Sequence, residues 1–302
     1  MINNRKFCYD IPTEENRNKL IKKLKNKYSF IKTGVVSKSL CKRDIPYIQI
    51  GNPKNEVLLS ACFHGTEWLT TLLLLHFTDE ICDSIEKKRK ISEIDIADFF
   101  EQKGVLILPC MNPDGVEISI KGPKAALEYC KLVEKVSNND TTHWQANARG
   151  VDLNHNFNAD WKGLRNREIR AGILGPAPTR YGGTAPESEP ESKAIASLCR
   201  FSRIRTAFAF HSQGEEIYWD YGKYTPQRSE LMARILAMSS GYIASSPEGL
   251  AVGGGFKDWF IKEFKRPAFT IEIGKGENPL PIEDLEDIYK KLEELLVLSI
   301  IM

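Results

Sequence analysis

Two stretches of the 302-residue sequence carry side chains that could bind a metal ion. His64 and Glu67 stand three residues apart, where an apolar run over 57–62 ends and a helical pattern begins. At that spacing both side chains can face one point on a first helical turn. His211 directly follows a second apolar run, 204–210. Because a catalytic zinc ion takes imidazole nitrogen and carboxylate oxygen from three protein ligands, these three residues are the candidate ligands.

Each of these side chains also has a structural explanation. HxxE pairs occur by chance on surface helices, and a lone histidine after an apolar strand is more often a packed core residue. His76 lies in a helical pattern and His143 in a loop, and neither has a partner at ligand spacing. Glu272 ends a third apolar run, 268–271. A buried carboxylate without a partner would be costly there, so we expect Glu272 to have a function.

Apolar runs alternate with helical patterns along the chain, which predicts an α/β fold with helices on both faces of a sheet. Chemistry in such folds lies at strand ends, where His64, His211 and Glu272 fall. We expect a hairpin or two short strands within 29–50, further strands at 57–62, 105–109, 204–210 and 268–271, and helices at 13–28, 67–87, 188–201, 226–240 and 282–300.

Local signals refine this division of the chain. Thr13 is a suitable helix cap, and Ser188-Glu189-Pro190-Glu191 fits a capping box. Asn112-Pro113-Asp114-Gly115 predicts a turn. No repeat or linker interrupts the sequence, so we expect one catalytic domain, 46–302, with an N-terminal appendage, 1–45, packed on it.

Composition disfavours several classes of function. With 42 basic and 40 acidic residues the net charge is +2, so we expect neither a nucleic-acid nor a membrane partner. Residues 1–8 lack the apolar run of a secretory signal. Seven cysteines without a CxxC pair indicate free thiols in the cytoplasm rather than a disulfide framework. A serine hydrolase is disfavoured because no GxSxG occurs, and no cysteine has an evident histidine partner.

Five motifs occur in the order found in zinc carboxypeptidases. The sequence therefore resembles that family over about residues 45 to 290. The resemblance implies a mixed, mostly parallel central sheet and one zinc ion bound by His64, Glu67 and His211. The motifs are His64-Gly65-Thr66-Glu67-Trp68, Asn112-Pro113-Asp114-Gly115, Asn147-Ala148-Arg149-Gly150-Val151-Asp152-Leu153-Asn154, Phe210-His211-Ser212 and Pro267-Ala268-Phe269-Thr270-Ile271-Glu272-Ile273-Gly274.

The resemblance also implies roles for three residues beside the metal. Glu272 would be the general base that takes a proton from the attacking water. Arg149 would stabilise the oxyanion, and Asp152 would orient a zinc-binding histidine. Simpler roles stay open for two of them: Arg149 could pair with a surface carboxylate, and Asp152 could cap a turn.

Departures from the family pattern narrow the substrate. The family's Asn-Arg pair, which clamps a substrate carboxylate, is Asn154-His155 here, and histidine lacks the bidentate fork of arginine. The family's mobile tyrosine falls near Leu250, so that role is absent or moved. Three segments resemble the bacterial γ-D-glutamyl-meso-diaminopimelate peptidases: His211 to Trp219, Gly253 to Ile261 and Gly274 to Pro281.

Lys257 supplies a physical reason for that substrate. By family spacing it reads the side chain after the scissile bond, and its ammonium could pair with the carboxylate on the diaminopimelate side chain. The alternative is a solvated lysine beside Asp258. We therefore expect a zinc peptidase of peptidoglycan peptides. The alternatives are a general metallocarboxypeptidase acting on L-peptides, including acidic tails, and an inactive family member that binds wall peptides.

Overall fold

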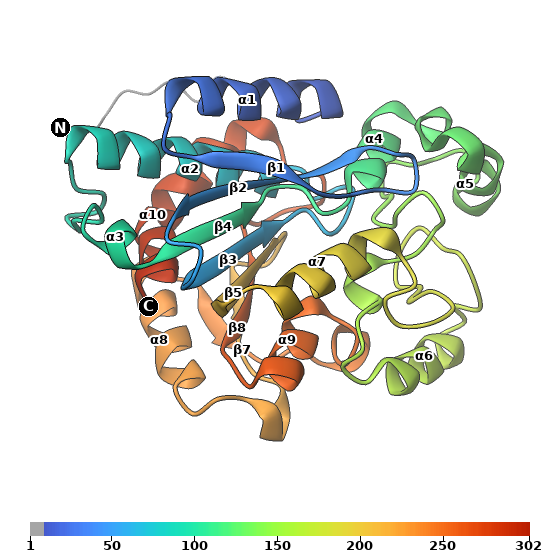
Figure 1. Ribbon diagram of the computed structural model, residues 1–302. Coiled ribbons are helices and arrows are strands. Elements are labelled where there is room, and N and C mark those ends of the chain that lie inside the picture. The colour runs from blue at the N-terminus through green and yellow to red at the C-terminus, as the bar shows by residue number, and fades with distance from the viewer. Residues whose placement is uncertain (1–8) are drawn as a thin grey trace.

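A computed structural model describes residues 9–302, whose strands form one eight-stranded sheet in the order β1-β2-β4-β3-β5-β8-β6-β7 (Figure 1). The pairs β4–β3, β3–β5, β5–β8 and β6–β7 are parallel, and the other three are antiparallel. The predicted mixed, mostly parallel sheet is therefore confirmed. The strands are β1 (Lys32–Lys38), β2 (Asp44–Gly51), β3 (Glu56–Ala61), β4 (Gly104–Leu108), β5 (Ile204–His211), β6 (Glu216–Tyr218), β7 (Ile243–Ser245) and β8 (Ala268–Glu272).

Helices cover both faces of this sheet, because its central strands are apolar on both sides. Val57 and Leu59 of β3 pack into one core with α2, α8 and α10. Leu58 points to the opposite face and packs with α7 and α9. Figure 1 shows α7 and α9 in front of the strands and α2 and α10 behind them. These helices are α2 (Leu69–Lys87), α7 (Pro190–Phe201), α8 (Ser229–Ser240), α9 (Phe256–Phe264) and α10 (Leu285–Ile301).

The N-terminal segment belongs to the same sheet. Thr13 caps α1 (Glu14–Lys27) by accepting a hydrogen bond from the Asn16 N–H, as predicted. β1 and β2 form the predicted hairpin, and β2 pairs with β4, so the sheet continues across residue 45. The division into appendage and catalytic domain stays a prediction, and the expectation that residues 1–8 carry no secretory signal lies outside the described residues.

Two local predictions are wrong. Asn112 does not start a simple turn: it caps a helix, α4, by accepting a hydrogen bond from the Gly115 N–H at 2.8 Å. Ser188 does not cap α7, because its hydroxyl donates to Glu189 instead and that helix has no side-chain cap. Apolar periodicity also missed β6, β7 and α9, together with α3 (Phe99–Gln102), α4 (Pro113–Lys121), α5 (Cys130–Ser137) and α6 (Trp161–Arg170).

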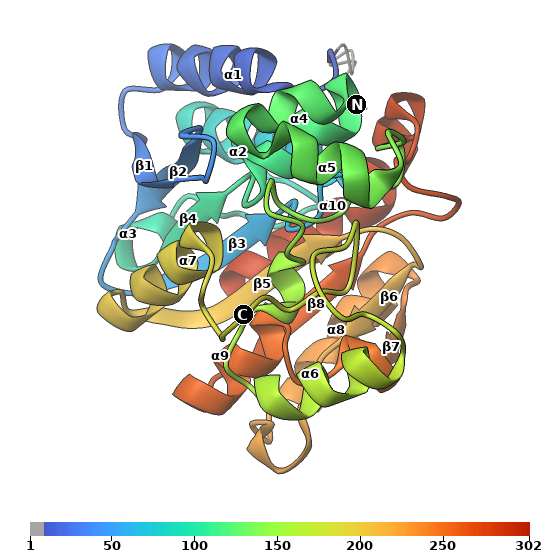
Figure 2. The ribbon, with the colours of Figure 1, turned by 90° about the vertical axis from the view of Figure 1, so that its right-hand side faces the viewer.

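The segment between α5 and α7 crosses in front of the strand ends (Figure 2). It brings its polar side chains to the edge of the sheet where β3, β5 and β8 end. None of the described helices has the length and apolar character needed to cross a membrane. The six cysteines among the described residues are free thiols, and five of them are buried.

Candidate active site

Parallel strands bring the predicted site residues to one edge of the sheet. β5 lies between β3 and β8, and His211 at the end of β5 is in register with Glu272 at the end of β8. His64 and Glu67 follow β3 in a tight turn, in which the Glu67 N–H donates to the His64 carbonyl at 3.1 Å. The expectation that this pair shares a first helical turn is wrong, because α2 begins only at Leu69.

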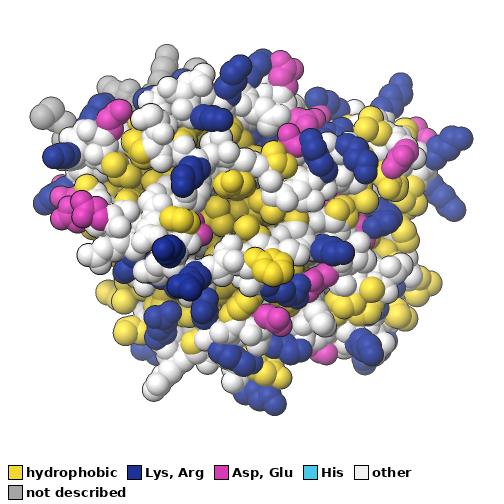
Figure 3. Space-filling view, in the orientation of Figure 1, with side chains coloured by type: hydrophobic (Ala, Val, Ile, Leu, Met, Phe, Trp, Pro, Cys, Tyr) yellow, Lys and Arg dark blue, Asp and Glu magenta, His cyan; other side chains and the backbone are white. Residues whose placement is uncertain are grey.

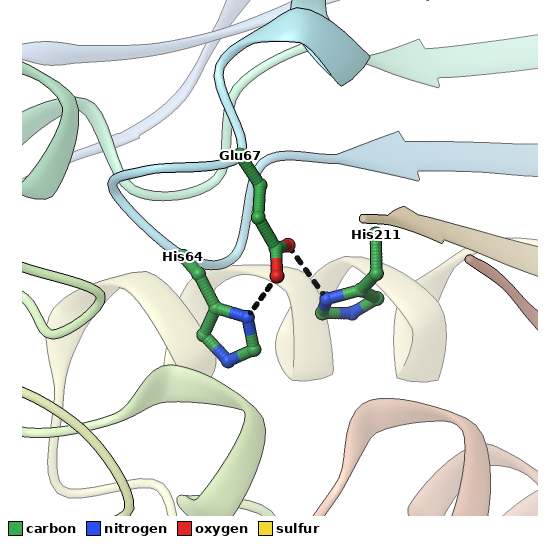
Figure 4. A group of neighbouring side chains, drawn as sticks. All are labelled: His64, Glu67 and His211. Atoms are coloured by element: carbon green, nitrogen blue, oxygen red, sulfur yellow. Dashed lines mark hydrogen bonds and ion pairs between the residues drawn. The ribbon is translucent and has the colours of Figure 1, made fainter. Parts of the chain in front are cut away.

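The side chains of His64, Glu67 and His211 converge from two strand ends (Figure 4). One carboxylate oxygen of Glu67 lies 2.7 Å from His64 Nδ1, and the other lies 2.9 Å from His211 Nδ1. One ligand atom from each side chain lies within 4.8 Å of the others, the one such group of His, Cys, Asp or Glu within residues 9–302. This donor set, two imidazole nitrogens and a carboxylate, fits a catalytic zinc ion.

Asp152 holds His64 from the far side of its ring. One carboxylate oxygen lies 3.0 Å from His64 Nε2, and the other accepts the Arg180 N–H at 2.8 Å. Asp152 also accepts the Asn154 N–H, so it caps a turn as well. Burial opposes ionisation, but His64 holds the pKa of Asp152 well below its usual range. Such a contact fixes the ring so that Nδ1 faces Glu67.

Charges in this buried cluster compensate one another. Burial opposes protonation of His64, but Glu67 and Asp152 raise the pKa of His64 well above its usual range. Burial likewise opposes ionisation of Glu67, but the imidazoles lower the pKa of Glu67. The carboxylates of Glu67 and Asp152 therefore favour a positive charge at this point. A metal ion held by His64, Glu67 and His211 would supply that charge.

Glu272 lines the same pocket as His64. Burial, together with the negative charge of Glu67, raises the pKa of the Glu272 carboxyl well above its usual range. A carboxylate whose proton affinity is raised in this way is suited to act as a general base.

The pocket in front of these groups has a volume of about 450 Å³. Lys257 and Asp258 line it and form a buried ion pair, with Lys257 Nζ 2.6 Å from Asp258 Oδ1. Lys257 Nζ also donates to the Asp220 carbonyl at 2.5 Å. The alternative prediction, a solvated lysine beside Asp258, is therefore wrong about solvation. Lys257 does pair with Asp258, but both side chains are buried.

Three further predicted positions line this pocket: Asn154, His155 and Leu250. The Asn154 side-chain oxygen accepts the Phe256 N–H at 3.0 Å. His155 Nδ1 lies 2.8 Å from a carboxylate oxygen of buried Glu168. Leu250 and His155 therefore line the pocket, whereas their correspondence to the family's tyrosine and arginine stays a prediction.

The family model for zinc carboxypeptidases matches residues 18–294. The chain belongs to the zinc carboxypeptidase family. It is 34% identical over 273 residues to the gamma-D-glutamyl-L-diamino acid endopeptidase 1 of Lysinibacillus sphaericus, a match that covers 90% of this chain and 67% of that protein. It is 30% identical over 282 residues to the uncharacterized protein YqgT of Bacillus subtilis (strain 168), covering 92% and 74%. The predictions of a zinc-dependent peptidase and a zinc cofactor are confirmed.

Solved structures show the same fold. Bovine thrombin-activatable fibrinolysis inhibitor, in complex with a tick carboxypeptidase inhibitor, matches with a TM-score of 0.75 and 21% identity, covering 97% of this chain and 96% of that one. The murein-tripeptide amidase MpaA of Escherichia coli O157 matches with a TM-score of 0.52 and 21% identity, covering 88% and 89%.

Arg149 of this zinc carboxypeptidase homologue is not among the residues that line the pocket. Its guanidinium donates to one oxygen of buried Glu189, from Nε at 3.2 Å and from Nη2 at 3.0 Å. Arg149 therefore forms an ion pair, as the alternative prediction held, but with a buried carboxylate rather than one on the surface. The side chain is 42% exposed, so it is not packed in this position.

The zinc peptidase also has a pocket residue that no sequence pattern singled out. Arg180 lines the pocket, and its side chain is exposed. Its backbone has a φ of 65°, a conformation that arginine rarely adopts, and its N–H is bound by Asp152. Residues held in such conformations concentrate at functional sites. Nothing in the sequence distinguishes Arg180 from other loop arginines, because its position depends on that long-range contact.

Proposed function

We propose that this zinc peptidase hydrolyses the γ-D-glutamyl–meso-diaminopimelate bond of peptidoglycan-derived peptides. The named Lysinibacillus relative supports a γ-D-glutamyl-diamino acid substrate. His155 at the position of the family's arginine argues against a general carboxypeptidase of L-peptides.

The buried pair of Lys257 and Asp258 is the observation that carries this proposal. The distal end of a diaminopimelate side chain carries both a carboxylate and an ammonium group. A pocket wall with one fixed cation and one fixed anion can pair with both groups, whereas the end of a lysine side chain offers only an ammonium, which Lys257 repels. Because Lys257 and Asp258 are already buried, substrate binding costs little further desolvation of these two side chains.

We propose that His64, Glu67 and His211 hold one zinc ion and that Asp152 orients His64. Zinc bound there would lower the pKa of its water, so that hydroxide is available at neutral pH, and would polarise the scissile carbonyl. Glu272 accepts a proton from the attacking water and returns it to the leaving amine of diaminopimelate. The raised pKa of Glu272 supports its role as proton acceptor, because burial and the charge of Glu67 increase its affinity for a proton.

Recognition of the glutamyl side falls to other residues. We propose that Arg180 and Asn154 bind the free α-carboxylate of D-glutamate, in place of the family's Asn-Arg clamp. Arg149 stabilises the oxyanion in this scheme, for which it must exchange Glu189 for substrate. The free thiols support a reducing compartment, so we propose that the substrates are muropeptides in the cytoplasm.

The decisive experiment uses protein loaded with one zinc per chain and the tripeptide L-Ala-γ-D-Glu-meso-diaminopimelate. Release of diaminopimelate is followed by mass spectrometry beside the lysine analogue and ordinary L-peptides. We expect cleavage of the diaminopimelate peptide, with Lys257→Met and Asp258→Asn each reducing its preference over the lysine analogue by at least about tenfold, the value of one charge-assisted hydrogen bond. Faster cleavage of L-peptides would identify a general metallocarboxypeptidase, and binding without cleavage an inactive wall-peptide binder.

A further inference from the structure

A second pocket lies at the opposite end of β5 from the zinc ligands. It has a volume of about 460 Å³ and is lined by Lys54, Asn55, Arg203, Arg205, Arg228 and Arg266. Arg205 stands one residue after the start of β5, so the pocket is about 20 Å from His211 at 3.3 Å per residue. Figure 3 shows Lys and Arg side chains gathered on this face, over the start of β5 and beside α8.

This pocket has no acidic residue in its lining. None of its four arginines forms an ion pair with any residue from 9 to 302. Arg205 donates to the Ile300 carbonyl and Arg266 to the Ile204 carbonyl, both at 2.5 Å. Carbonyl groups fix the direction of these guanidiniums but do not neutralise them. The positive charge of the pocket is therefore left for a ligand.

Arg205 is partly buried and packs against the protein within this pocket. Its guanidinium lies over the Phe99 ring, with its central carbon 5.5 Å from the ring centroid. Its Nε is buried and has no hydrogen-bond partner among the described residues. Burial and the neighbouring charge of Arg228 lower the pKa of Arg205 to about 10. A buried donor without an acceptor costs free energy that a bound anion can return.

The start of α8 adds a second source of positive potential. Arg228 is the residue before the first turn of this 12-residue helix, and no side chain caps that turn. The adjacent Ser229 is fully buried, and its hydroxyl has no partner within the described part of the chain. Backbone carbonyls accept the Ser229 and Met232 N–H groups, so this helix start contributes through its dipole, whose positive end favours a bound anion.

We propose that this pocket binds a phosphate group, independently of the peptidase site. Guanidinium groups present planar pairs of N–H donors that match the oxygens of a tetrahedral oxyanion. Five cationic side chains around one volume favour a dianion over a monoanion such as acetate or chloride.

The test is isothermal titration of the zinc-loaded full chain with orthophosphate and, separately, with glycerol 1-phosphate, at constant ionic strength in chloride. The pocket variant is Arg203→Gln with Arg228→Gln, two exposed positions whose replacement leaves the core intact. The matched control, Arg170→Gln with Arg234→Gln, removes the same charge from exposed positions elsewhere. Peptide hydrolysis is measured for both, and we expect it unchanged.

We expect one phosphate per chain for wild type and control, and a dissociation constant at least about tenfold higher for the pocket variant. Binding of orthophosphate alone would identify a free ion as the ligand, whereas binding of both probes would identify a phosphate group carried on a larger molecule. Equal affinity in the pocket variant, or binding that is lost when zinc is removed, would overturn the proposal.

Discussion

The charged side chains at the two ends of β5 are arranged in opposite ways. At its carboxyl end, buried Glu67 lies between two imidazoles, and Asp152 is bound by His64 and a backbone N–H. At its amino end, four arginines share a pocket without one acidic residue in the lining. The same strand thus connects a cluster of matched charges with a cluster of like charges.

The contrast shows what each end requires from outside the protein. Matched charges hold side chains in place before any ligand arrives, which a catalytic site needs because its groups must not reorganise during the reaction. Like charges repel, so salt screens the repulsion within the arginine pocket and a bound anion would relieve it. We therefore expect the zinc-ligand end of β5 to be sensitive to small structural changes, and the arginine pocket to be sensitive to salt and to added anions.

Breaking the matched cluster should have the largest effect. We expect Glu67→Gln to lose stoichiometric zinc and measurable hydrolysis, because an amide cannot balance two imidazoles and a cation. Asp152→Asn, which weakens the contact to His64 and the hydrogen bonds from the Arg180 and Asn154 N–H groups, should lower zinc affinity by about 10–100-fold. Zinc content after dialysis and kcat/KM measure both. Full zinc occupancy in Glu67→Gln would contradict the assigned ligand set.

Removing the general base should leave the metal site intact. We expect Glu272→Gln to lower kcat by about 10²–10⁴-fold while zinc content stays at one per chain. Glu216→Gln is the matched control, because Glu216 lies opposite Glu272 in the β6–β8 register and bonds to Tyr218. A similar loss of kcat in both variants would show that charge near the pocket matters, rather than the proton acceptor itself.

Arg149 tests whether a residue outside the pocket lining enters the reaction. If Arg149 donates to the oxyanion, Arg149→Gln should lower kcat by about 10²–10³-fold. If it only pairs with buried Glu189, kcat should hold while unfolding in urea occurs at lower denaturant concentration, because the carboxylate loses its cation. Arg149→Lys separates the outcomes further, since lysine retains the charge without the bidentate fork.

Glu56 gives the smallest expected effect, at the arginine end of β3. Burial raises the pKa of Glu56 to about 7. Between about pH 4.5 and 7 the unfolded chain ionises this group while the folded chain keeps its proton, so stability falls as pH rises. We expect Glu56→Gln to remove a decline of roughly 1–3 kcal/mol from urea unfolding measured across that window. Exposed Glu286→Gln, the control, should keep the wild-type pH dependence.

The fold class and the strands β3, β4, β5 and β8 were predictable from the order of residues, and the zinc cofactor from the motifs that resemble the zinc carboxypeptidases. Those strands are short apolar runs buried on both faces; His211 and Glu272 end two of them, and His64 follows a third. The strand signals lie within a few residues of one another, whereas the zinc ligands lie on separate stretches and were predicted from the order of motifs that resembles zinc carboxypeptidases. The wrong predictions at Ser188 and Asn112 mark the limit, because the same residue types can start a turn or cap a helix: Ser188 does not cap α7, whereas Asn112 caps α4.

Contacts between polar groups on different elements were not predictable from the order of residues. Lys257 is held by a carbonyl 37 residues away, Arg149 by a carboxylate 40 residues away, and Arg180 by Asp152 across 28 residues. The arginine pocket draws its lining from four separate stretches of chain. Electrostatic interactions depend on distance in space and on burial, and neither can be read from the order of residues when the partners lie on different elements.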